Sequence, residues 1–225
     1  MKFQDLRREL KDYYSKKSYE NAEKYLEKGK KILDAAYAAF ETEAESLRAT
    51  AGVLDRAEFE KAVSVLASAE RIAASGCGHS GIACRHFAHL CCCIERPARF
   101  ISPSEAVHGG LGYICGGDVM MLASRGGETD ELVPIAKICR AKGATVILVT
   151  EKPGSTLGRL SDIILRISVT RECDRDNCQG TTSFAVTSAV FDALGTALIE
   201  KLDYSSREFA VIHPNGAVGK RLNSK

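Results

Sequence analysis

The sequence lacks several features that would place it in a specialised class of protein. Its 31 Lys and Arg residues nearly balance its 29 Asp and Glu residues, for a formal net charge of +2. There is no basic stripe beyond scattered Lys and Arg near the N-terminus, which argues against a nucleic-acid partner. No apolar run approaches the ~18 residues of a membrane span, and residues 1–31 resemble neither a signal peptide nor a transit peptide. We therefore expect no membrane partner.

The nine Cys residues lack the paired C-x-x-C spacing of a structural zinc site. Their odd number, with three in a row at 91–93, is typical of a reduced intracellular chain. A metal site remains the alternative, with candidate ligands Cys84, His86 and His89, or Cys173 and Cys178. We expect small core thiols and surface imidazoles instead, and therefore neither a metal nor a cofactor.

The first part of the chain is predicted to be helical. Residues 17–50 contain no Pro, and their apolar residues recur at helical spacing, which predicts one or two helices. Another helix is expected at about 55–68, with a wide apolar face around Phe59 and Leu66. We therefore predict an N-terminal helical segment, 1–68, that packs on the core or on a neighbouring subunit.

After Glu70 the pattern changes to short apolar strands that alternate with helices. The runs at 119–123 and 145–149 are almost continuously apolar, as expected for parallel strands covered on both faces. We predict an α/β domain over 69–225, a doubly wound five-stranded parallel sheet with right-handed crossovers. The expected strands are 71–75, 98–101, 118–123, 145–150 and 162–167, and the expected helices are 80–93, 130–142 and 182–202.

The loop 76–81 follows the first strand and reads Gly-Cys-Gly-His-Ser-Gly. Ligands of such sheets bind beyond the carboxyl ends of the strands. Glycines let the backbone approach an anion, the helix N-terminus favours negative charge, and Ser80 adds a hydroxyl. No acidic residue closes the second strand, as a dinucleotide site would require. The alternative is a tight strand-to-helix turn without any ligand.

The loop 124–129 follows the third strand and reads Ser-Arg-Gly-Gly-Glu-Thr. Ser124 and Thr129 could offer hydroxyls to phosphate oxygens, and Gly126 could offer an amide. Glu128 would repel phosphate, so we place it beside sugar hydroxyls. The structural alternative is helix capping, with Thr129 as the N-cap and an acid in the first turn.

Further chemical groups stand in the segments Glu105–Gly109, Thr181–Ser183 and His213–Gly216, and at Glu172. Each segment supplies a hydroxyl, a carboxylate or an imidazole. His213 also has a purely structural interpretation, because a His before Pro can simply bond a backbone carbonyl, and a structural role stays open for His108 as well. Together the segments indicate a site that binds a phosphate and moves a proton on a sugar.

These motifs resemble the SIS (sugar isomerase) domain over about residues 70–220, and within it the arabinose-5-phosphate isomerase family. The family has a Gly-x-Gly-Lys-Ser-Gly loop, a Glu-Ala-x-His-Gly-Asp segment, a Ser-x-Ser-Gly-Glu-Thr loop, an Arg/Lys-Glu-x-Cys segment and a closing His-Pro-x-Gly. Its N-terminal helices are also expected here. The resemblance implies interconversion of D-arabinose 5-phosphate and D-ribulose 5-phosphate through a cis-enediol.

The chain departs from this pattern at three places. His79 stands where the family has Lys, and Gly110 stands where it has Asp. Gly126 occupies the position of the family's second Ser, and Arg125 precedes it. Arg125 is a candidate replacement for the lost positive charge, since its fork suits phosphate. Members of the family often continue into a pair of CBS domains, which we expect this chain to lack.

The resemblance also implies roles, which could be permuted among the candidates. Glu172 is the expected enediol base, His213 opens the ring or shuttles the hydroxyl proton, Glu128 orients hydroxyls, and His79 and His108 support them. The expected substrate-binding residues are Gly78, Ser80, Ser124, Arg125, Gly126, Thr129, Thr181, Thr182 and Ser183.

The resemblance further implies a cytoplasmic bacterial enzyme that supplies Kdo synthesis for lipopolysaccharide or capsule. It implies a dimer or homotetramer with a small sugar phosphate as its ligand. Two alternatives stay open: an isomerase for another sugar phosphate, and a non-catalytic sugar-phosphate sensor.

Overall fold

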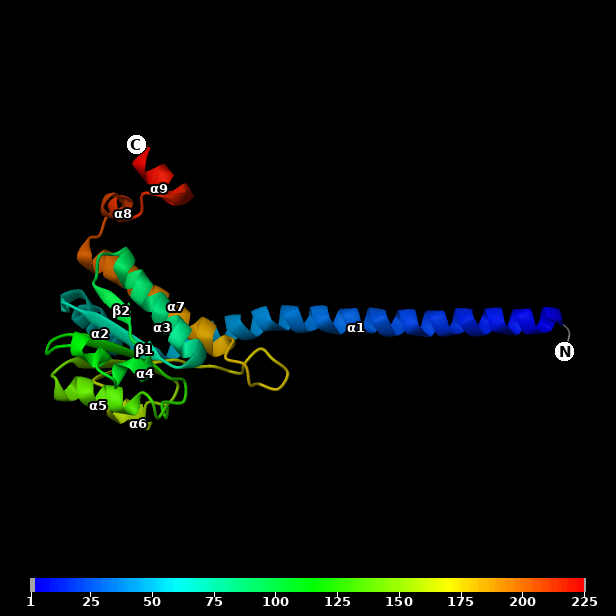
Figure 1. Ribbon diagram of the computed structural model, residues 1–225, viewed down its shortest axis with the longest axis horizontal. Coiled ribbons are helices and arrows are strands. Elements are labelled where there is room, and N and C mark those ends of the chain that lie inside the picture. The colour runs from blue at the N-terminus through cyan, green and yellow to red at the C-terminus, as the bar shows by residue number, and fades with distance from the viewer. Residues whose placement is uncertain (1–2, 225) are drawn as a thin grey trace. The chain divides into compact units, whose positions relative to one another are not determined.

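A computed structural model describes residues 3–224 of the chain (Figure 1). These residues form two compact units, the first ending at Thr42 and the second beginning at Glu43. Helix α1 (Phe3–Val53) runs through this boundary, and the second unit contains all the other elements. The division into a helical segment 1–68 and a sheet domain 69–225 stays a prediction.

One or two helices were expected at 17–50, and the structure has a single helix, α1, that extends beyond this range at both ends. Its interior contains no Pro, so no backbone N–H is lost along its length. The apolar residues that repeat along it are exposed, for example Leu26 at 73% and Phe40 at 72%. The prediction that this stripe packs on a core or a neighbouring subunit remains open.

The second unit is built on a five-stranded sheet in which every strand pair is parallel. This confirms the predicted fold class. The order is β2-β1-β3-β4-β5. The strands are β1 (Ile72–Gly76), β2 (Ala98–Phe100), β3 (Val119–Ala123), β4 (Thr145–Thr150) and β5 (Ile163–Arg166). Every residue of β1 and β3 is buried, which explains why their sequences show no alternation of polar and apolar residues.

The strand order creates a switch point between β1 and β3. The chain leaves β1 for β2 on one side and later enters β3 on the other side. Loops that leave the carboxyl ends of β1 and β3 therefore flank a crevice, the usual ligand position in open parallel sheets. The loops 76–81 and 124–129 are these two loops.

Helices cover both faces of the sheet and enclose two apolar cores. One core joins one face of the sheet to α2 (Arg56–Ser68), α3 (Gly78–Cys93) and α7 (Thr182–Leu202). The other core lies against α4 (Pro103–Ala106), the 3-10 helix η1 (Gly110–Tyr113), α5 (Val133–Ala141) and α6 (Thr156–Arg159). Short helices α8 (Ser206–Ile212) and α9 (Gly216–Asn223) end the described chain.

Helix α7 matches its predicted bounds, 182–202, but corrects another expectation. By length and composition alone it could cross a membrane, although the sequence was expected to hold no such stretch. Its apolar residues instead pack in the core, where Phe87 of α3 meets Phe191 with ring centroids 4.8 Å apart. A helix buried in a protein core can be as long and as apolar as a membrane-spanning helix.

Candidate active site

The first loop needs its glycines for close backbone packing. Gly78 has a φ of +52°, and a Cβ on Gly81 would lie 2.5 Å from the carbonyl oxygen of Gly76. The loop lines a cavity of about 500 Å³ beside the first turn of α3. Glycine backbone and helix N-terminus next to a cavity provide a place where an anion can approach. Gly78 lines this cavity and Ser80 does not, so their roles as phosphate ligands stay predictions, and the turn itself also requires glycine.

Residues that the sequence analysis missed also line this cavity, among them Arg85, Ser102, Ser104 and Glu131. Ser102 follows β2, so the rule of strand ends could have identified it. Arg85 lies seven residues after Gly78 on the same face of α3, and its guanidinium stacks 4.0 Å from the ring centroid of Phe100. Arg85 thereby brings a positive charge to the lining of the cavity.

The second loop is held together by its own hydroxyls. The Ser124 and Thr129 hydroxyls lie 2.8 Å apart, and the amide of Gly127 donates to Ser124 Oγ over 3.1 Å. The prediction that Thr129 caps the following helix was wrong. Helix α5 begins four residues later, at Val133, with Leu132 as its N-cap and Pro134 in its first turn.

Glu172 lies between β5 and α7 and is only 4% exposed. One carboxylate oxygen, Oε1, accepts a hydrogen bond of 2.7 Å from Arg125 Nη1. The other, Oε2, accepts from the Ser183 amide at 3.1 Å and from the Thr181 hydroxyl at 3.5 Å. The carboxylate is therefore fixed at the amino end of α7, where the helix dipole favours negative charge.

Arg125 joins the second loop to Glu172. Its Nε lies 3.1 Å from Glu151 Oε2, so two carboxylates share one guanidinium. The sequence analysis did not single out Glu151, which follows β4 directly. Arg125 is thus committed to protein carboxylates, which weakens its case as a replacement for the family's phosphate-facing Lys.

The three hydroxyl residues at the start of α7 have different surroundings. Thr182 is fully buried, and its hydroxyl lies 3.2 Å from the Cys173 sulfur. Thr181 accepts from the Cys173 amide and also reaches Glu172. Thr182 therefore supports the loop from behind, whereas Thr181 and Ser183 lie beside the Glu172 carboxylate.

Glu128 is exposed and caps α6. Its Oε1 accepts a hydrogen bond of 2.8 Å from the amide of Thr156, the first residue of that helix. Hydrogen bonds from Thr156 hold the pKa of Glu128 below its ordinary value of 4.5. Glu128 is therefore ionised near neutral pH and already has a structural partner.

The three candidate histidines lie in different places. His79 borders Gly180 and packs edge-on against Phe184, so it faces the amino end of α7. His108 is exposed in the segment after α4. His213 stacks on Phe209 and lines a cavity with His89 and other residues near the end of α3.

Within one chain, His213 and the first loop lie at opposite ends of α3. A helix of 16 residues is about 24 Å long. Within a single copy, Arg125 pairs with Glu172 and His79 lies beside the start of α7, whereas His213 lies apart from the first loop.

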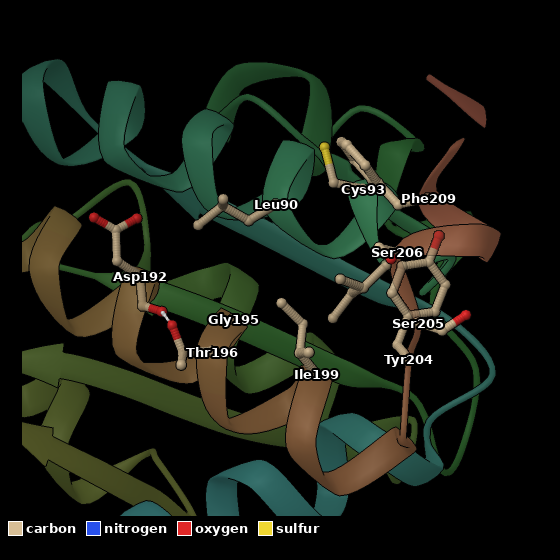
Figure 2. Close-up of a pocket in the computed structure, with 11 residues that line it drawn as sticks. Leu90, Cys93, Asp192, Gly195, Thr196, Ile199, Tyr204, Ser205, Ser206 and Phe209 are labelled. Atoms are coloured by element: carbon tan, nitrogen blue, oxygen red, sulfur yellow. Dashed lines mark hydrogen bonds between the residues drawn. The ribbon is translucent and has the colours of Figure 1, made fainter. Parts of the chain in front are cut away.

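A second hollow lies at the carboxyl end of α7 and has a different character (Figure 2). This groove of about 480 Å³ is lined mainly by apolar side chains such as Leu90, Ile199 and Phe209. None of the residues predicted for the site lines it. Among residues 3–224, no group of three or more His, Cys, Asp or Glu side chains is arranged to hold a metal ion.

The sequence is similar to several known proteins. The profile of the SIS domain matches residues 65–197. Arabinose 5-phosphate isomerase KpsF of Escherichia coli is 32% identical over 170 residues, which cover 75% of this chain and 54% of that protein. Arabinose 5-phosphate isomerase KdsD of Pseudomonas aeruginosa is 34% identical over 166 residues, which cover 73% of this chain and 51% of that protein. The chain thus spans about half the length of these relatives.

Solved structures show the same fold over most of the chain. One from Listeria monocytogenes, provisionally named a sugar-phosphate isomerase, has a TM-score of 0.79 at 38% identity and covers 82% of this chain and 97% of that one. A protein of Escherichia coli CFT073, solved in complex with arabinose 5-phosphate, has a TM-score of 0.77 at 27% identity. The match covers 82% of this chain and 98% of that one. The family profile, the fold and the loops of the switch point agree: the chain belongs to the SIS domain family.

Proposed function

We propose that the chain is an aldose-ketose isomerase that interconverts D-arabinose 5-phosphate and D-ribulose 5-phosphate. One observation carries the proposal: three loops, which contain His79, Arg125 and Glu172, converge at the amino end of α7. A buried carboxylate therefore lies beside two loops suited to an anion. The names of the curated relatives favour this pair of sugars.

In this proposal the loops at the switch point bind the phosphate. Gly78 and Ser80 offer the first turn of α3, and Ser124, Gly126 and Thr129 offer the second loop. Thr181 and Ser183 complete the site on the side of α7, and Thr182 supports them. The sugar then extends over the cavity that Arg85 and Ser102 border.

The same proposal assigns the proton transfer to Glu172. Its carboxylate removes the C2 proton of the open-chain aldose, which gives a cis-enediol, and returns the proton to C1 of the ketose. A proton also moves from O2 to O1, for which His213, His79 and His108 are candidates. Well-placed acid–base groups contribute about 10²–10⁴-fold each.

His213 can take part only if another copy presents it, because its own chain holds it at the far end of α3. We therefore propose a homo-oligomer, a dimer or tetramer, in which sites are completed across an interface. The proposal also places the enzyme in the bacterial cytoplasm, where arabinose 5-phosphate supplies Kdo synthesis. No nucleic acid, membrane, metal or cofactor enters the reaction that we propose.

The test is incubation of the purified protein with D-ribulose 5-phosphate, followed by NMR detection of D-arabinose 5-phosphate. A panel of pentose, hexulose and heptulose phosphates tests which sugar phosphate is the substrate. The panel is needed because His79 and Arg125 depart from the family's pattern at the phosphate-binding loops. Turnover of arabinose 5-phosphate in preference to the others supports the proposal. Tight binding of a sugar phosphate without turnover would instead indicate a sensor.

A further inference from the structure

The side chain of Arg125 makes its contacts with protein carboxylates. Nη1 lies 2.7 Å from Glu172 Oε1, and Nε lies 3.1 Å from Glu151 Oε2. Its guanidinium is about one-third exposed, whereas the Glu172 carboxylate is almost fully buried. Two negative charges thus face one positive charge at this point of the site.

The backbone around Arg125 is fixed as firmly as its side chain. Its carbonyl oxygen accepts hydrogen bonds from the Glu151 amide and the Thr150 hydroxyl, each over 3.0 Å. Glu151 in turn accepts from the Val169 amide through Oε1. Arg125 and Glu151 therefore link the loops after β3, β4 and β5.

This arrangement is poorly suited to phosphate binding by Arg125. A phosphate that approached the guanidinium would meet the charges of Glu151 and Glu172, and like charges repel. The arrangement suits Glu172 instead, because a buried carboxylate is costly unless it is paired and hydrogen-bonded. Arg125 supplies the pair, and Ser183 and Thr181 supply the remaining hydrogen bonds.

We propose that Arg125 is a positioning residue that holds the Glu172 carboxylate in the orientation required for proton abstraction, and that Glu151 anchors Arg125 in this role. The inference rests on the proposed function, since it assigns Glu172 the part of the base. Arg125 then acts through Glu172 and contributes little to the binding of the sugar phosphate.

The test compares kcat and KM for Arg125→Met, Arg125→Lys and wild type in the full chain. A misplaced catalytic group costs about 10²-fold in rate, so we expect kcat of Arg125→Met to fall by about 10- to 100-fold. KM should change less than about threefold, since an interaction that acts mainly in the transition state lowers kcat rather than binding. The kcat of Arg125→Lys should lie between those of wild type and Arg125→Met, because Lys keeps the positive charge but lacks the forked guanidinium.

Arg140→Met is the matched control, since Arg140 of α5 pairs with Asp162, away from the proposed site. Its kcat should equal that of wild type. A wild-type kcat with a raised KM in Arg125→Met would overturn the inference and make Arg125 a phosphate ligand. If Arg125→Met does not fold by circular dichroism, wild-type kcat in Arg125→Lys overturns it equally. Absence of turnover in the wild type would remove the proposed function as well.

Discussion

The two ends of helix α7 differ in almost every property. At the amino end Glu172, Arg125 and Ser183 form a compact set of charge-assisted hydrogen bonds. At the carboxyl end an apolar groove is bordered by Ile199 and Phe209 (Figure 2). His213 stacks on Phe209. Charged groups held in fixed positions can move protons, whereas an apolar groove can only bury surface. On this difference we place the proposed chemistry of a single copy at the amino end.

The largest effect is expected at the amino end, for Glu172→Gln. Loss of a general base costs about 10²–10⁴-fold, so kcat should fall by that amount. Glu172→Asp should retain more activity, because it keeps a carboxylate. Glu200→Gln, at the opposite end of the same helix, is the control and should retain wild-type kcat. Steady-state kinetics and thermal melting of all three variants separate loss of chemistry from loss of fold.

The next prediction asks whether the carboxyl end of one copy serves the amino end of another. His213→Ala and Glu172→Gln should each have a strongly reduced kcat, because each removes one group from the proposed site. Subunits of the two variants that are mixed, unfolded together and refolded should regain activity. Mixed oligomers would contain some sites with both wild-type residues. If the kcat of the mixtures stays as low as that of the single variants, and light scattering confirms oligomers, His213 does not complete the site of another copy.

The second loop offers a smaller effect with a matched pair. Gly127 has a φ of +69°, and a Cβ there would lie 2.0 Å from Ser155 Oγ. Gly127→Ala should lower the free energy of unfolding by about 1–3 kcal/mol, since strain of this kind costs that much. Nothing lies within 4 Å of a Cβ on Gly126, so Gly126→Ala should change the free energy of unfolding by less than about 0.5 kcal/mol. Urea titrations measure both, and equal stability of the two variants would contradict the loop geometry.

The smallest effect concerns Glu128. Its pKa is depressed by hydrogen bonds from Thr156, so its contribution to stability exists above the ordinary value of 4.5 and is lost as the pH falls through the lower folded value. Glu128→Gln should therefore melt slightly below wild type at pH 7, and the gap should close below pH 4.5. Melting curves across this range measure the effect, and a gap that widens in acid would refute it.

The sequence predicted the parts of the fold that depend on local pattern. Uninterrupted apolar runs identified β3 and β4, and helical periodicity placed α7 at its observed bounds. The short helices α4, α6, α8 and α9 were missed, because one or two turns are too short for periodicity to identify. Thr129 was wrongly assigned as a cap because its hydroxyl bonds Ser124 instead.

The candidate site was predicted only where position in the sheet decided it. The loops after β1 and β3 meet at the switch point because the strand order requires it. The partners of Arg125 depend on Glu151 and Glu172, which lie 26 and 47 residues further along the chain. No local pattern reveals such contacts. The separation of His213 from Glu172 likewise follows from helix length and packing, which the motifs alone do not contain.

Solvent exchange during turnover tests the central claim most directly, because a proton moved by a carboxylate base can exchange with water. Ribulose 5-phosphate is incubated with the protein in deuterated water, and carbon-bound deuterium is followed by NMR. The account predicts deuterium at C2 of arabinose 5-phosphate and at C1 of ribulose 5-phosphate with the wild type, and neither with Glu172→Gln. Deuterium incorporation that is undiminished in Glu172→Gln would contradict it.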